Sequence, residues 1–66
     1  MSLWIVACIA EVDDDISIVI VNAPSWQEAL NKSPAVWWHT PPYLSLDEAT
    51  ALAWNTYRCH IAIKPL

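Results

Sequence analysis

The hydrophobic positions at the start of the chain predict two adjacent β-strands. Residues 3–12 are almost continuously apolar with β-branched and aromatic members, which is typical of a strand buried on both faces, so we expect it to be central in its sheet. Residues 16–22 alternate isoleucine on one face with Ser17, Val19 and Val21 on the other. Three consecutive aspartates between the two runs tolerate a turn without glycine. Together these features predict a β-hairpin.

Two capping boxes predict two helices. Ser25 stands three residues before Glu28, and the same spacing recurs between Ser45 and Glu48. The first helix must end no later than the residue before Pro34. The second is longer, with acidic residues in its first turn that complement the helix dipole. The apolar stripes expected to face the sheet are Trp26, Ala29 and Leu30 in the first helix and Leu46, Ala49, Ala53 and Tyr57 in the second, with Leu52 beside the latter.

The last part of the chain predicts a half-buried strand over residues 58–64, with Cys59, Ile61 and Ile63 on its inner face. Residues 35–43 are ambiguous, because their hydrophobicity favours a short edge strand that two prolines would end after a few residues. The expected order is therefore β-β-α-(β)-α-β, an α+β fold. It forms one domain, residues 1–66, in which a small antiparallel sheet packs against two helices.

Composition indicates a folded chain with little polar surface. The sequence has 66 residues, is 56% hydrophobic, contains five tryptophans and is only 15% charged, which excludes intrinsic disorder. A chain of this length buries only about 60% of the surface that it exposes when unfolded, so its stability is marginal. A second subunit would supply the missing burial, and a homodimer is therefore an alternative to a monomer.

Charge and targeting signals restrict the classes of partner and the compartment that we expect for this protein. The net charge is −4, and no cluster of lysine or arginine is present to engage a phosphate backbone, so we expect no nucleic-acid partner. No apolar run is long enough to span a membrane. The apolar start lacks the positive charge of an export signal, which favours the cytoplasm and reduced thiols in Cys8 and Cys59.

Catalytic and cofactor chemistry finds little support. The sequence contains no glycine, which excludes P-loops and dinucleotide-binding loops. Cys59 and His60 are adjacent on a strand and point to opposite faces, so they cannot act as a nucleophile–base pair. With Cys8 and His39 they form the one set of candidate metal ligands, but without the spacing of a structural zinc site. We expect no enzyme activity and no cofactor, with a Cys/His metal-binding protein as the second alternative.

The segment from Trp37 to Tyr43 concentrates three aromatic side chains and two prolines. A small sheet would bury only one of the adjacent tryptophans, and exposed aromatic side chains on a stiff backbone are typical of protein-recognition surfaces. The alternative is that the segment folds over the sheet as a lid. The residues expected to contact a partner are Trp37, Trp38, His39, Tyr43 and Arg58, with Asp13, Asp14 and Asp15 adding electrostatic steering.

One known family shares part of this pattern. The run from Leu46 to Ala49, the apolar positions up to Tyr57 and a final strand resemble the helix-to-strand portion of the small RNA-polymerase inhibitors of T-odd coliphages, which are acidic, of similar length and open with a hairpin. The resemblance covers about the last 20 residues and the hairpin pattern. The insertion of residues 24–44 departs from that family, as does a last strand with only Arg58 and Lys64 as bases.

The resemblance implies a phage-encoded protein that binds a host enzyme in the host cytoplasm. Our leading hypothesis is therefore a small non-enzymatic module, encoded by a phage or mobile element, that inhibits or modulates a larger protein. A structural or assembly subunit working as a homo-oligomer is the alternative, with the aromatic segment at its two-fold axis.

Overall fold

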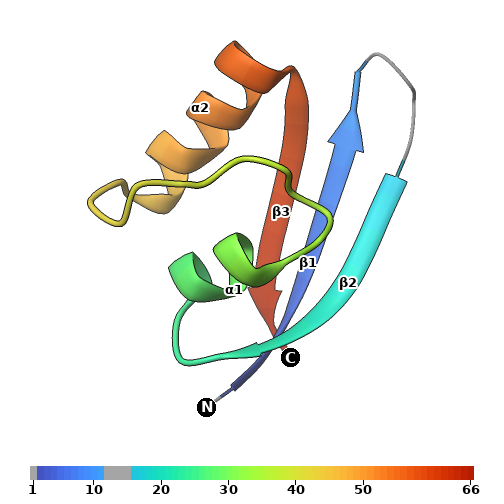
Figure 1. The fold of residues 1–66 in the computed structure, drawn as a ribbon, viewed down its shortest axis with the longest axis vertical. Helices are drawn as coiled ribbons and strands as arrows, with labels where there is room; N and C mark the ends of the chain where they lie inside the picture. The colour runs from blue at the N-terminus through green and yellow to red at the C-terminus, as the bar shows by residue number, and fades with distance from the viewer. Residues whose placement is uncertain (1, 12–15) are drawn as a thin grey trace.

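A three-stranded antiparallel sheet in the order β2-β1-β3 forms the base of the molecule (Figure 1). The computed structural model describes residues 2–11 and 16–66, so the predicted aspartate turn lies outside the described residues. The strands are β1 (Ser2–Ala10), β2 (Ile16–Ala23) and β3 (Cys59–Pro65). Strand β1 pairs with both neighbours, which confirms the hairpin and the central position predicted for the first strand.

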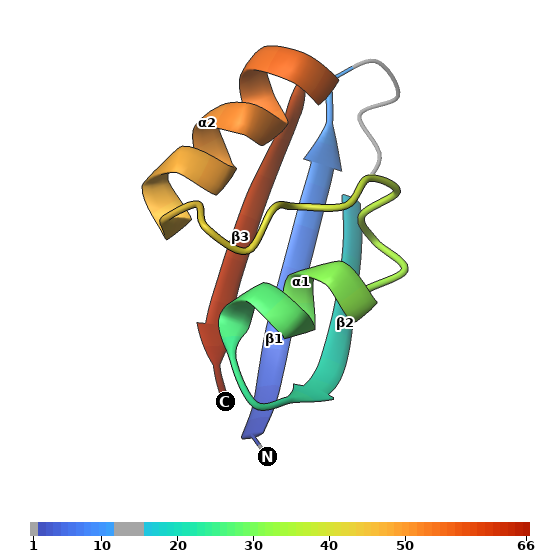
Figure 2. The ribbon, with the colours of Figure 1, turned by 60° about the vertical axis from the view of Figure 1, so that its left-hand side comes forward.

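Both helices pack on the same face of this sheet (Figures 1 and 2). Helix α1 (Trp26–Lys32) follows β2 and packs on all three strands, and helix α2 (Leu46–Tyr57) packs on β3. The element order β-β-α-α-β confirms the predicted α+β class. We call the sheet face under the helices the covered face and the opposite one the open face.

The predicted capping box is complete at α2, whereas only one of its two hydrogen bonds forms at α1. At α2, Ser45 Oγ accepts from the backbone N–H of Glu48 at 3.2 Å, and Glu48 Oε1 accepts from the backbone N–H of Ser45 at 3.1 Å. At α1, Ser25 Oγ accepts from the N–H of Glu28 at 3.4 Å, without the reciprocal bond. The caps differ in φ, −147° at Ser25 and −74° at Ser45, which turns the Ser25 N–H in another direction.

Residues 33–45 do not form the edge strand considered from sequence. They cross the covered face between the two helices as an irregular segment, the aromatic loop (Figure 2). Prolines at 34, 41 and 42 lack the backbone N–H group that a strand donates to its neighbour. The side chain of Asn31 forms hydrogen bonds with the loop backbone in place of a neighbouring strand. Its Nδ2 donates to the carbonyl oxygen of Thr40 at 3.1 Å, and its Oδ1 accepts from the Thr40 N–H at 2.8 Å.

The core lies between the covered face, the helices and this loop. Strands β1 and β3 contribute Val6, Cys8, Cys59, Ile61 and Ile63, as the predicted alternation of β3 required. The helices contribute Ala29, Leu30, Ala49 and Ala53, and the loop contributes Ala35, Val36 and Trp38. The loop is therefore the lid of an undersized core, although it also carries exposed aromatic side chains.

Candidate functional site

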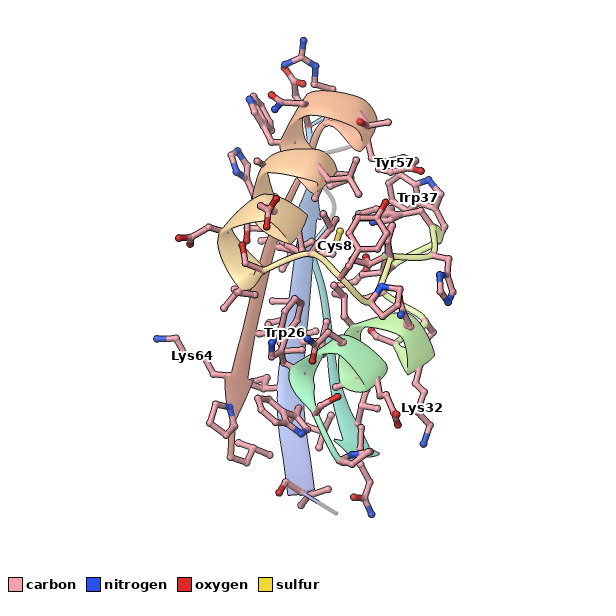
Figure 3. All side chains as sticks on the ribbon, turned by 90° about the vertical axis from the view of Figure 1, so that its left-hand side faces the viewer. Cys8, Trp26, Lys32, Trp37, Tyr57 and Lys64 are labelled. Carbon is pink, nitrogen blue, oxygen red and sulfur yellow. The ribbon has the colours of Figure 1, made fainter. Side chains whose placement is uncertain are left out.

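Three aromatic rings form a compact cluster where the aromatic loop meets the end of α2. Trp38 stacks on Tyr57 with ring centroids 4.4 Å apart and planes 8° from parallel. Trp37 packs edge-on against both rings, at 4.9 Å from Trp38 and 6.3 Å from Tyr57. Trp37 and Tyr57 lie side by side in Figure 3, and Cys8 lies beside them toward the middle of the molecule. We call Trp37, Trp38 and Tyr57 the aromatic cluster.

The two tryptophans of the cluster have opposite environments. Trp38 is buried at 7% exposure, whereas Trp37 is 64% exposed. The expectation that only one of them would be buried is confirmed. Trp38 is consequently not available as a partner-contact residue, because its ring is packed in the core and supports Trp37 from below.

Two further members of the predicted contact set are exposed on the same loop. Tyr43 is 81% exposed in a turn over residues 41–44, which the backbone N–H of Leu44 closes on the carbonyl oxygen of Pro41 at 3.4 Å. His39 is also exposed. The loop thus exposes aromatic and imidazole side chains. Its prolines and the hydrogen bonds of Asn31 with Thr40 restrict the backbone that carries them.

Arg58 is exposed but lies against a different aromatic side chain. It caps α2 in the left-handed conformation, with φ of 54°, and its N–H donates to the carbonyl oxygens of Ala53 and Trp54. Its guanidinium carbon lies 5.3 Å from the centroid of the Trp54 ring, and His60 stacks on Trp54 at 4.3 Å. The structure therefore separates Arg58 from the aromatic cluster. The remaining predicted contacts, Asp13, Asp14 and Asp15, lie outside the described residues.

The two cysteines meet on the covered face. Cys8 and Cys59 are both buried and free, on adjacent strands. Burial raises the pKa of the Cys8 thiol from 9.0 to about 11, and the neighbouring Cys59 adds to the shift through charge repulsion and a side-chain hydrogen bond. Cys59 Sγ also donates to the carbonyl oxygen of Tyr57 at 3.3 Å. Both thiols are core side chains, and Cys8 favours the neutral form because burial raises its pKa.

The candidate metal ligands do not converge. His60 lies on the open face of β3, opposite Cys59, and His39 is exposed on the loop. Residues 2–11 and 16–66 hold no group of three or more histidine, cysteine or acidic side chains that could bind a metal ion. The same residues enclose no pocket. In this part of the chain, neither helix has the length and hydrophobicity needed to cross a membrane.

Sequence reasoning overlooked a second exposed apolar surface, on the open face of the sheet. Ile16, Ile18 and Ile20 project from β2 there, at 60–62% exposure, beside Leu3 and Ile9 of β1 at 50% and 40%. A signal was present in the sequence, because residues 16–22 are aliphatic on both faces and the sequence predicts only two short helices with which to cover a sheet.

Comparison with known proteins adds no relative. No family model, no curated protein and no solved structure matches this chain.

Proposed function

We propose that this chain is a non-enzymatic interaction module that binds a larger protein through Trp37 and Tyr43 and thereby inhibits or modulates it. The observation that supports this most directly is the state of Trp37. Trp37 is 64% exposed, yet its ring packs edge-on against the stacked rings of Trp38 and Tyr57. An exposed tryptophan in a fixed orientation binds a partner with little loss of side-chain entropy.

The residue types favour protein recognition. Tryptophan and tyrosine are enriched among the side chains that dominate interface energies, since each offers a large apolar ring with a polar edge. Tyr43 adds such a ring at 81% exposure on the same loop. The inhibitory role, the phage or mobile-element origin and a host enzyme as the partner rest on the resemblance of the helix-to-strand segment to the phage polymerase inhibitors.

Capture of the partner by immobilised protein tests this function. The bait is incubated with bacterial lysate, retained proteins are identified by mass spectrometry, and the affinity of the purified candidate is measured by calorimetry. We expect the double substitution Trp37→Ala with Tyr43→Ala to weaken binding at least about 30-fold, as expected of hot-spot residues. Circular dichroism should remain that of the wild type, because neither side chain is part of the buried core.

The matched control is Ile20→Thr on the other face of the sheet. It alters an apolar side chain whose exposure, 62%, is close to the 64% of Trp37. It should retain the partner with wild-type affinity. Equal affinity of the wild type and the Trp37→Ala, Tyr43→Ala variant would refute the proposed role of the loop.

A further inference from the structure

Within residues 2–11 and 16–66, no helix or loop covers the open face of the sheet, which is an apolar surface. Its outward side chains come from all three strands, and its exposed large hydrophobic side chains belong to β2 and β1. Figures 1 and 2 show α1, α2 and the aromatic loop on the other side of the sheet. The aliphatic members of the open face are Leu3, Ile5, Ala7, Ile9, Ile16, Ile18, Ile20 and Ala62.

This exposure conflicts with the hydrophobic pattern of β1. A nearly continuous apolar strand is typical of sheets covered on both faces, and a half-exposed strand normally alternates apolar with polar side chains. Here Leu3 and Ile9 are 50% and 40% exposed although they flank fully buried Val6 on the same strand. The sequence of β1 therefore matches a state in which a second layer packs on the open face.

Bulky and small side chains lie side by side across the strands of the open face. Its middle row runs from Ile18 through Ala7 to Ala62, so a bulky side chain stands beside two small ones. The adjacent rows place Ile5 and Ile9 above and below Ala7. An isoleucine projecting from β2 thus forms a ridge next to a hollow over β1, and a second sheet turned by a two-fold rotation would set its own Ile18 into that hollow.

The positions of the polar and charged side chains determine which strands of the open face can lie at the centre of an interface between two copies. On β3, Lys64 lies on the open face and His60 stacks on Trp54 of α2 at the edge of the sheet, whereas the outward side chains of β2 are three isoleucines and Asn22. A two-fold axis parallel to the strands, between β2 and β1, would place β2 of each copy over β1 of the other. Both β3 strands would then lie at opposite outer edges, and the two Lys64 ammonium groups would stay in solvent, apart from one another.

We propose that the open face is the interface of a homodimer in which two sheets pack face to face through β1 and β2. This interface differs from the two-fold axis expected at the aromatic loop, and it is independent of the proposed function, since Trp37 and Tyr43 lie on the opposite side of the molecule. The dimer gives β1 the cover on its second face that its sequence predicts.

The available area sets the strength of this dimer. At about 130 Å² for a fully exposed four-carbon side chain, the five most exposed members present roughly 350 Å² per copy. With Ile5, Ala7 and the backbone between them, the pair would bury about 1,000 Å², close to the smallest area of a specific interface. We therefore expect a dissociation constant in the micromolar range.

Sedimentation equilibrium from about 1 to 200 μM tests the interface. The wild type should pass from monomer to dimer over this range, and its Tm should rise with protein concentration. Ile18→Glu puts a carboxylate at the centre of the interface from a position that is 60% exposed in the monomer. It should weaken association at least about 100-fold and abolish the concentration dependence of Tm.

Tyr43→Glu is the matched control, because it introduces the same charge at an 81% exposed position of the aromatic loop. It should dimerise like the wild type. If Ile18→Glu does not fold, Ile18→Thr keeps the β-branched shape and should weaken association about tenfold while the circular dichroism spectrum stays native.

Three results would overturn the proposal: a wild type that is monomeric at every concentration, a dimer that survives Ile18→Glu, or a dimer lost in Tyr43→Glu. A monomeric wild type whose captured partner is lost in Ile18→Glu but kept in the Trp37→Ala, Tyr43→Ala variant would assign the open face to another protein. That outcome would refute both proposals. If only the partner-capture experiment or only the dimerisation experiment contradicts its proposal, the result identifies which of the two surfaces was assigned wrongly.

Discussion

On the covered face of the sheet Val6 and Cys59 are fully buried, whereas on the open face Ile16, Ile18 and Ile20 remain 60–62% exposed. The two faces are nevertheless built from the same classes of side chain, aliphatic and mostly β-branched. What distinguishes them is the second layer, since both helices and the aromatic loop pack on one side only. Hydrophobicity along a strand therefore reports how much burial a face requires, but not whether the same chain supplies it.

An isoleucine-to-alanine substitution on each face of the sheet is the strongest test of the difference between the two faces. Ile61→Ala empties a site that is 9% exposed and should lower the free energy of unfolding by about 3 kcal/mol, because it leaves a cavity under the helices. Ile18→Ala, at 60% exposure, should cost about 1 kcal/mol or less in dilute solution, mainly through lower β-propensity. Urea denaturation at about 1 μM measures both changes.

Protein concentration then separates the two faces further. The cost of Ile18→Ala should grow when denaturation is repeated at higher concentration, because the wild type gains stability from association that the variant lacks. The cost of Ile61→Ala should change much less. Equal costs for the two substitutions in dilute solution would contradict the description of the open face as uncovered in the monomer.

The covered face should also respond to alkaline pH. Burial holds the pKa of Cys8 at about 11 in the folded chain against 9.0 as its ordinary value. Between these values the unfolded chain releases the thiol proton and the folded chain keeps it, so the unfolded state binds fewer protons. The free energy of unfolding should therefore fall by up to about 2 kcal/mol as pH rises from 9 to 11, and this group should have no effect near neutrality.

The comparison protein for this pH effect is Cys8→Ala, which is less stable at every pH but lacks the thiol. Subtracting its pH profile removes the contributions of tyrosine and lysine side chains that titrate in the same range. The difference between the two profiles should slope downward above pH 9. A flat difference would show that Cys8 ionises as easily in the folded chain as in the unfolded one.

Local signals in the sequence predicted most of the fold. The Ser45–Glu48 spacing located the start of α2, and the alternation of Cys59, Ile61 and Ile63 located the inner face of β3. The edge strand considered within residues 35–43 did not form, because the deciding interaction joins Asn31 to Thr40, nine positions apart, and no periodicity encodes it. Side-chain clamps of this kind depend on how the helix is placed, which the local pattern does not specify.

The candidate site was only partly predictable for a related reason. The composition of residues 37–43 indicated an exposed aromatic surface, and Trp37 and Tyr43 provide one. The sequence did not identify Trp38 as the buried member, because that depends on the stacking of its ring with Tyr57. Arg58 is predicted to contact the same partner as the loop, but its guanidinium lies over the ring of Trp54.

The covered face also contains polar atoms that the fold does not satisfy. Trp38 Nε1 and Thr40 Oγ1 are buried, and neither has a hydrogen-bond partner among the described residues. A buried hydroxyl without a partner costs about 1–3 kcal/mol, and valine has nearly the same shape without the hydroxyl. Thr40→Val should consequently raise the free energy of unfolding by about 1 kcal/mol.

The same substitution at Thr50 provides the contrast, because Thr50 Oγ1 donates to the carbonyl oxygen of Leu46 at 2.8 Å. Thr50→Val loses this bond and should be neutral or destabilising by about 0.5 kcal/mol. If Thr40→Val were instead as destabilising as Thr50→Val, the Thr40 hydroxyl would have a partner in solution. The lid over the covered face would then be held by its side chains as well as by the backbone bonds to Asn31. A stabilised Thr40→Val would mean that the loop closes the core through apolar packing and those backbone bonds, despite the unsatisfied hydroxyl that it buries.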